Sequence, residues 1–154
     1  MKKIQNRLSG YSLFELLLTL TLIAVISTLA YPAYQQSILH IRRIQAKTAL
    51  YKIMYQQERF YTRNASYMPF SAASPSPDNK VFVWWSGENP QSSFYEISAT
   101  ACNQSNIRSC ILLTASPGTS RVNSHFSDPV CDKLMLDSHN QKTHSGTGTK
   151  AQCW

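Results

Sequence analysis

The sequence predicts an α+β protein in which one long N-terminal helix packs on a four-stranded antiparallel β-sheet. An apolar run is followed by an amphipathic pattern that keeps helical spacing to about residue 62. Short strand-like segments, separated by turn-rich pieces, fill the rest of the chain. With 154 residues the chain has room for one membrane segment and one compact domain, so we expect a single head.

The apolar run has the length of a membrane-spanning helix. It extends over 21 residues, from Tyr11 to Tyr31, and a helix of that length spans about 31 Å at about 1.5 Å per residue. The hydrocarbon layer of a bilayer is about 30 Å thick. Basic residues precede the run, at Lys2, Lys3 and Arg7. Because positive charge favours the cytoplasmic side, we expect the rest of the chain to be exported.

The helical pattern resumes after Pro32 and becomes amphipathic. We expect one helix from Ser12 to Thr62, with a kink at Pro32, because proline removes one backbone hydrogen bond. Apolar residues at three- and four-residue spacing form its packing stripe: Ala46, Ala49, Leu50, Ile53, Met54, Phe60 and Tyr61. We place Arg43, Lys47 and Lys52 off this stripe.

Four segments are predicted as strands, after a loop at 64–79 that is rich in Ser, Pro and Asn. The first, Lys80–Trp85, is apolar on both faces, and the second, Phe94–Thr100, alternates in polarity. Cys110–Ser116 and Lys133–Asp137 complete the predicted sheet.

The four cysteines, Cys102, Cys110, Cys131 and Cys153, all lie in the exported part, where an oxidising compartment permits disulfides. Their spacing contains no C-x-x-C pair, so we expect no metal site. Four cysteines allow three connectivities, and the pairing of neighbours in sequence would close two small loops. The histidines show no metal-ligand spacing, and we expect neither a cofactor nor an enzymatic activity.

The net charge of +7 is unevenly distributed. Three positive residues belong to the first ten, and the helix between residues 40 and 63 carries six against Glu58 alone. From residue 64 onward, six basic residues balance six acidic ones, so most of the head is neutral. The basic helix could meet anionic lipid headgroups or acidic patches of neighbouring subunits.

One carboxylate, Glu15, interrupts the apolar run, and the residues around it resemble a known signal. The stretch "GYSLFE", from Gly10 to Glu15, is similar to the class III signal of type IV prepilins, with Tyr11 and Ser12 in place of the usual Phe and Thr. The resemblance implies that a prepilin peptidase cuts after Gly10 and methylates the new amine of Tyr11. It also implies a leader at 1–10, a membrane and filament-core helix half at 11–33, and a pilin head at 34–154.

The same resemblance gives Glu15 a role. In a filament, the apolar helix packs among neighbouring helices, where a lone carboxylate is costly. The freed amine of Tyr11 on the adjoining subunit can pair with it, so that Glu15 marks the correct assembly register.

Two later stretches extend the resemblance to PilE-type minor pilins. "QQERFYTRNASYM" (56–68) is similar to the end of the long helix in that group, and "CDKLMLDSHNQKTHSGTGTKAQCW" (131–154) to its C-terminal disulfide region. The resemblance implies a pilin fold and a subunit first held in the inner membrane, then incorporated into type IV pili for assembly, motility, adhesion or DNA uptake. The implied partners are major and minor pilins, the prepilin peptidase and the inner-membrane assembly machinery.

Two alternatives remain open at this point. A ComP-type minor pilin would bind DNA, and Lys133, Lys142 and Lys150, with Trp154 available for stacking, are the candidate contacts. We do not favour DNA binding on sequence grounds, because the head as a whole is neutral. A type II secretion pseudopilin shares the N-terminal signal, but typically lacks a C-terminal disulfide and carries a calcium-binding acidic loop.

Overall fold

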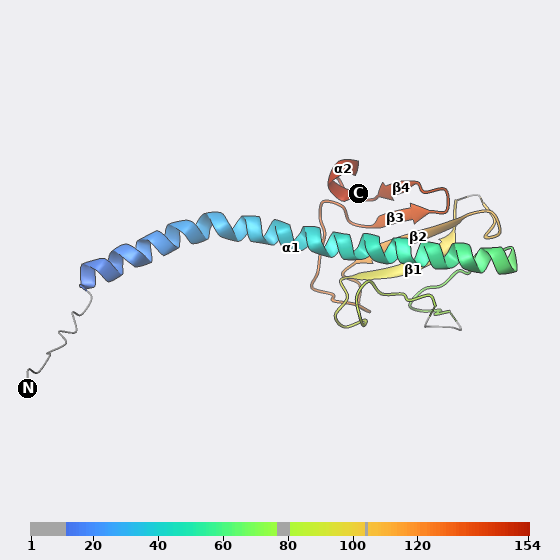
Figure 1. The fold of residues 1–154 in the computed structure, drawn as a ribbon, viewed down its shortest axis with the longest axis horizontal. Helices are drawn as coiled ribbons and strands as arrows, with labels where there is room; N and C mark the ends of the chain where they lie inside the picture. Colours follow the sequence, from blue (N-terminus) through green and yellow to red (C-terminus); the bar gives the residue numbers. More distant parts are fainter. Residues whose placement is uncertain (1–11, 77–80, 104) are drawn as a thin grey trace, which may run out of the picture. The chain divides into compact units, whose positions relative to one another are not determined.

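The computed structural model describes residues 12–76, 81–103 and 105–154 (Figure 1). In chain order its elements are α1 (Leu13–Asn64), β1 (Tyr95–Ala101), β2 (Ile111–Pro117), β3 (Leu134–Asp137), β4 (Lys142–His144) and α2 (Lys150–Cys153). The predicted long helix is therefore confirmed to within two residues at each end. The described residues divide into two separate compact units, one up to Ile38 and one from Leu39 to Trp154.

The described part of the first unit is the N-terminal half of α1. Its large apolar side chains are exposed, and α1 is the one helix in the described part of the chain that is long and apolar enough to cross a membrane. The hydroxyls of Thr19, Thr21, Ser27 and Thr28 donate to carbonyls three or four residues earlier. An apolar environment would thus leave none of these hydroxyls unsatisfied. Pro32 lies inside α1, and the kink there stays a prediction.

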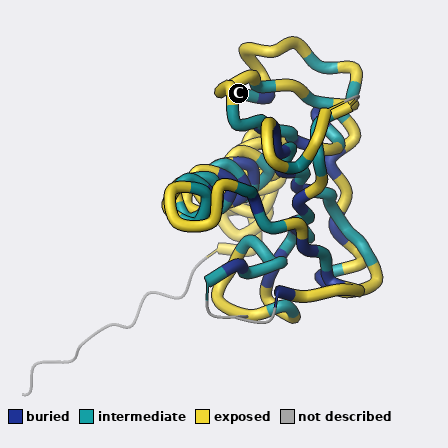
Figure 2. Tube along the Cα trace, turned by 90° about the vertical axis from the view of Figure 1, so that its right-hand side faces the viewer, coloured by how far each residue is buried: buried dark blue, intermediate teal, exposed yellow. Residues whose placement is uncertain are grey.

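The C-terminal half of α1 packs on the sheet through one face (Figure 2). Ala46, Leu50 and Ile53 are buried at the predicted three- and four-residue spacing. The prediction that Arg43 lies off this stripe is wrong, because Arg43 is only 9% exposed. It precedes Ala46 by three residues and Leu50 by seven, so it shares their side of the helix.

The sheet has the order β1-β2-β3-β4, and all its neighbours are antiparallel. Alternate residues of the first three strands are buried against the helix, which explains their alternating polarity: Tyr95, Ile97, Ala99, Ile111, Leu113, Ala115, Leu134 and Leu136. Three of the predicted strands are confirmed with shifts of one residue.

The predicted strand at Lys80–Trp85 is wrong. Lys80 lies outside the described residues, and in the remainder only Trp85 pairs, through an isolated bridge to Glu96. Phe82 is buried, edge-on to Phe60 and stacked on Phe70, both at 5.8 Å between ring centroids. Aromatic packing, rather than strand pairing, therefore explains the apolar pattern. The fourth strand is the short β4 at the edge of the sheet, whose polar residues carry no strand signal.

Two disulfides close the head. Cys102–Cys110 joins the facing ends of β1 and β2, and Cys131–Cys153 ties the chain before β3 to α2. Each contributes about 2 to 4 kcal/mol by the chain-entropy account. Gly146 lies against the backbone of Val130 and Cys131, where a Cβ atom would come 2.2 Å from the carbonyl oxygen of Val130. Only glycine lets the backbone approach so closely.

Candidate assembly determinants and nucleic-acid interface

The prepilin-type signal is described only in part. Gly10 and Tyr11, the expected sites of cleavage and methylation, lie outside the described residues. Glu15 lies exposed in the first turn of α1. A carboxylate is favoured there because the N-terminal end of a helix carries partial positive charge. The helix alone thus tolerates Glu15, and its pairing with a neighbouring subunit remains a proposal.

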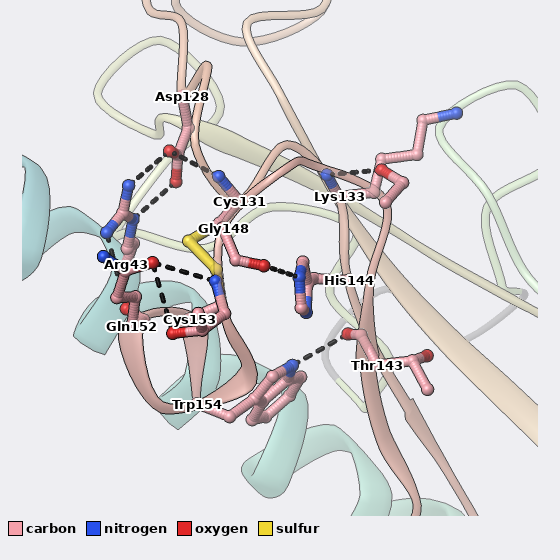
Figure 3. Close-up of a disulfide and its surroundings, with 12 residues drawn as sticks. Arg43, Asp128, Cys131, Lys133, Thr143, His144, Gly148, Gln152, Cys153 and Trp154 are labelled. Atoms are coloured by element: carbon pink, nitrogen blue, oxygen red, sulfur yellow. Dashed lines mark hydrogen bonds and ion pairs between the residues drawn. A yellow bond between two sulfur atoms is a disulfide. The ribbon is translucent and has the colours of Figure 1, made fainter.

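A buried ion pair joins α1 to the chain that precedes the second disulfide (Figure 3). The Arg43 guanidinium donates Nε to Asp128 Oδ2 at 2.7 Å and Nη2 to Oδ1 at 2.6 Å. The carboxylate also accepts from the Tyr95 hydroxyl at 2.8 Å and from the Cys131 N–H at 3.1 Å. Arg43 Nη1 lies 3.5 Å from the carbonyl oxygen of Gln152. One cluster therefore links helix, sheet and C-terminal segment.

The charges of this cluster stabilise one another. Burial alone would raise the pKa of Asp128, but the hydrogen bonds from Arg43, Cys131 and Tyr95 outweigh it and lower that pKa. The hydrogen bond from Arg43 to Asp128 raises the pKa of Arg43. Burial, followed by the bond to Asp128, raises the pKa of Tyr95. Asp128 is 2% exposed, so the pair is structural and does not face a ligand.

The C-terminal segment, residues 131–154, is held by its disulfide and by hydrogen bonds across it (Figure 3). The Trp154 indole N–H donates to the Thr143 carbonyl at 2.8 Å, and His144 Nε2 lies 2.6 Å from the Gly148 carbonyl oxygen. Ser145 Oγ accepts from the Lys133 N–H at 3.0 Å. These bonds make the segment a defined surface rather than a loose tail.

The three candidate DNA-binding lysines lie in this segment but are not equivalent. Lys133, just before β3, and Lys150, at the start of α2, are exposed. Lys142 is half-buried on β4, with its ammonium 5.4 Å from the Tyr51 ring centroid on α1. Lys133 and Lys150 are therefore available to phosphates, whereas Lys142 already has an aromatic partner.

Trp154 is also partly engaged. Its ring packs edge-on against Tyr51 at 6.4 Å, and the Lys47 ammonium lies 6.0 Å from its centroid. Burial and the nearby charges of Arg43 and Lys142 lower the pKa of Lys47. Sequence reasoning missed these contacts, because helix and C-terminus are about one hundred residues apart in the chain. Stacking of Trp154 on a base would require it to leave these neighbours.

The described residues bring ligand-type atoms of Cys102, Cys110 and Asp137 within 4.8 Å of one another. The two sulfurs are bonded to each other, so they offer no thiolate to a metal. Asp137 stabilises the turn that follows it, since its Oδ1 accepts from the His139 and Gln141 N–H groups at 2.9 and 2.8 Å.

A comparison with protein-family models matches residues 32–135, more than half of the chain, to a family described as "Type IV minor pilin ComP, DNA uptake sequence receptor". No curated protein matches the chain. The matched region holds the C-terminal half of α1, β1, β2 and the start of β3. It excludes the N-terminal signal.

Proposed function

Because the chain belongs to the type IV minor pilin family described as ComP, DNA uptake sequence receptor, we propose that it is a pilus subunit whose head binds DNA during uptake. The observation that carries the proposal is the position of the match. A match to the N-terminal signal would fit any type IV pilin, whereas this one lies on the head, which distinguishes one pilin from another. The family is one of type IV minor pilins, not of type II secretion pseudopilins.

The proposed route begins in the inner membrane, with the N-terminus in the cytoplasm. Prepilin peptidase cuts between Gly10 and Tyr11 and methylates the new amine, and the assembly machinery transfers the subunit into the filament. An apolar helix of membrane-spanning length supports the anchored stage. Exposed apolar side chains along that helix support the assembled stage, since neighbouring helices can cover them.

For DNA contact we propose the exposed pair Lys133 and Lys150 on the C-terminal segment. Lysine ammonium groups neutralise phosphates and release counterions, so binding should weaken as salt rises. Lys142 contributes less, because it is half-buried over Tyr51. The charge of the whole head does not decide the matter, because phosphate binding depends on the local surface.

The test is a gel-shift titration of the mature chain in detergent micelles, at two salt concentrations. The double variant Lys133→Glu/Lys150→Glu should weaken DNA binding by about tenfold or more and flatten its salt dependence. Lys52→Glu/Arg59→Glu, with the same change in charge on α1, is the matched control and should bind like the wild type. Absence of salt-sensitive binding by the wild type at micromolar concentration would refute DNA binding while leaving the pilin assignment intact.

A further inference from the structure

The two disulfides of the head differ in how accessible they are. Cys131 and Cys153 are both 0% exposed. In the other bridge, Cys110 is 3% exposed, whereas Cys102 is only half-buried. A disulfide is broken when a thiolate reaches one of its sulfurs, so access decides which sulfur is attacked. Attack is therefore expected at Cys102, and Cys110 would then be the leaving group.

The sulfur of this leaving group is surrounded by polar side chains. The Ser138 hydroxyl donates to Cys110 Sγ at 3.6 Å, and His139 Nδ1 lies 3.6 Å from the same sulfur. A thiolate is stabilised by hydrogen-bond donors and by a neighbouring imidazolium, which makes it a better leaving group. In the described part of the chain, the sulfurs of Cys131 and Cys153 have no such side-chain contact.

The turn after β3 holds both polar groups beside Cys110. Asp137 Oδ1 accepts from the His139 N–H at 2.9 Å, and the Ser138 N–H donates to the Ile111 carbonyl at 3.0 Å. The His139 side chain is exposed, so it can exchange protons with water. A carboxylate oxygen of Asp137 lies within 4.8 Å of the sulfurs of both cysteines, and its negative charge opposes a thiolate there. A proton donor at Cys110 is therefore needed for this bond to open easily.

The sheet does not need the Cys102–Cys110 bond to stay paired. β1 and β2 pair along their whole length, up to Ala101 opposite Ile111. Beyond the last pair, the Cys102 N–H still donates to the Cys110 carbonyl at 3.3 Å. Because these are backbone contacts, they remain when the sulfurs separate. The head can thus stay folded with this bridge reduced.

We propose that Cys102–Cys110 is a thiol–disulfide exchange site whose reaction partner is a protein dithiol. A thiolate of the dithiol bonds to Cys102 Sγ, the bond between the two cysteine sulfurs breaks, and its electron pair passes to Cys110 Sγ. This sulfur takes a proton from His139 Nδ1, which regains one from water. The second thiolate of the partner then attacks the partner sulfur held by Cys102, and Cys102 leaves and is protonated by water.

In this exchange the partner is oxidised by two electrons to a disulfide, and the bridge is reduced to two thiols. The Cys131–Cys153 bond stays closed, so the C-terminal segment keeps its structure and its exposed lysines. The inference goes beyond the proposed DNA binding and does not depend on it.

The first experiment compares the two bridges in the mature chain in detergent micelles. The protein is treated with dithiothreitol, samples are quenched with iodoacetamide, and the alkylated cysteines are counted by mass spectrometry. Cys102–Cys110 should be reduced at least about tenfold faster than Cys131–Cys153, while tryptophan fluorescence stays that of the folded head. Equal rates, or reduction only together with unfolding, would overturn the inference.

The second experiment tests the imidazole. His139→Leu should slow reduction of Cys102–Cys110 about fivefold or more, because the leaving sulfur loses its proton donor. His125→Leu is the matched control, since His125 is also exposed and its N–H is also held by a side chain two residues earlier, Asn123 Oδ1 at 3.1 Å. A destabilised variant would be reduced faster, so misfolding cannot imitate the expected result. His139→Leu reduced as fast as the wild type would contradict the role of His139.

The third experiment traps the intermediate. Thioredoxin with its second active-site cysteine replaced by serine can form the mixed disulfide but cannot resolve it. It should accumulate bound to Cys102 of the otherwise folded chain, which peptide mapping locates. Attachment at Cys110, Cys131 or Cys153, or no adduct at all, would show that the bridge is not an exchange site of this kind.

Discussion

At the scale of single residues, the Arg43–Asp128 pair shows how much of this head depends on one buried contact. The two side chains are 85 residues apart in sequence, and their hydrogen bonds tie α1 to the chain leading into the second disulfide. Nothing in the sequence indicated the pair. An arginine beside a helical stripe reads as a surface residue, and no pattern in the sequence connects it to an aspartate 85 residues later.

We predict that Asp128→Ala destabilises the head by about 3 to 5 kcal/mol, because it leaves the Arg43 guanidinium buried without its partner. Thermal unfolding followed by tryptophan fluorescence measures the change. The double variant Arg43→Met/Asp128→Ala should lose less than the sum of the two single variants, since it removes both charges. Additive losses would show that the pair contributes nothing as a pair.

The same ion pair makes the stability of the folded head depend on pH. The pKa of Asp128 is lowered in the folded head, so the unfolded chain binds more protons at acidic pH. The contribution of Asp128 is therefore present above its unfolded pKa of about 3.9 and is lost as the pH falls through the folded value. The Asp128→Ala variant should lose less stability than the wild type between neutral and strongly acidic pH.

At the scale of elements, α1 and three strands were predictable because each carries a clear period. The helix shows three- and four-residue spacing over its packed half, and the strands alternate every second residue. The predicted strand ending at Trp85 was wrong, because aromatic residues that pack as isolated side chains show the same apolar pattern as a buried strand. β4 could not be found, because a three-residue edge strand of polar residues has no period. The sequence located the candidate DNA-binding lysines in one segment. It did not indicate that Lys142 is half-buried while Lys133 and Lys150 are exposed.

The junction after α1 depends on a single side chain that no periodicity reveals. Gln57 is fully buried, and its amide donates to the Met68 carbonyl at 2.7 Å and accepts from the Met68 N–H at 3.0 Å. We predict that Gln57→Ala costs about 1 to 3 kcal/mol, because both backbone groups lose their partner. Hydrogen exchange of the Met68 amide should accelerate.

The neighbouring glutamine provides the control. Gln56 lines a groove between α1 and the chain around Trp85 and is partly exposed, so Gln56→Ala should leave both stability and the Met68 amide unchanged. Equal effects at the two positions would mean that helix propensity, rather than the clamp on the loop, explains the loss.

At the scale of the whole molecule, two separate surfaces serve the two proposed functions, pilus assembly and DNA binding. One surface is on α1, where Ile41, Ile44, Lys52 and Arg59 are exposed, and the other is on the disulfide-bounded C-terminal segment, which carries the two exposed lysines. A filament subunit that also binds DNA needs two separate surfaces, because neighbouring subunits cover the surface that they contact. Charge on α1 can then serve assembly, while charge on the C-terminal segment stays accessible to phosphates.

The last prediction concerns the anchor on which this division depends. Glu15→Val should preserve membrane insertion and processing, since it makes the apolar helix more apolar, but should lower the amount of subunit in sheared pili by about tenfold. The reason is the proposed pairing: without the carboxylate, the freed amine of Tyr11 on the adjoining subunit has no partner in an apolar core.

Thr19→Val is the matched control, because the Thr19 hydroxyl bonds within its own helix at 2.9 Å. Gly10→Val should instead block processing, which separates a failure to mature from a failure to assemble. Processed Glu15→Val at wild-type abundance in pili would contradict the pairing, because the amine would then have found its counter-ion elsewhere.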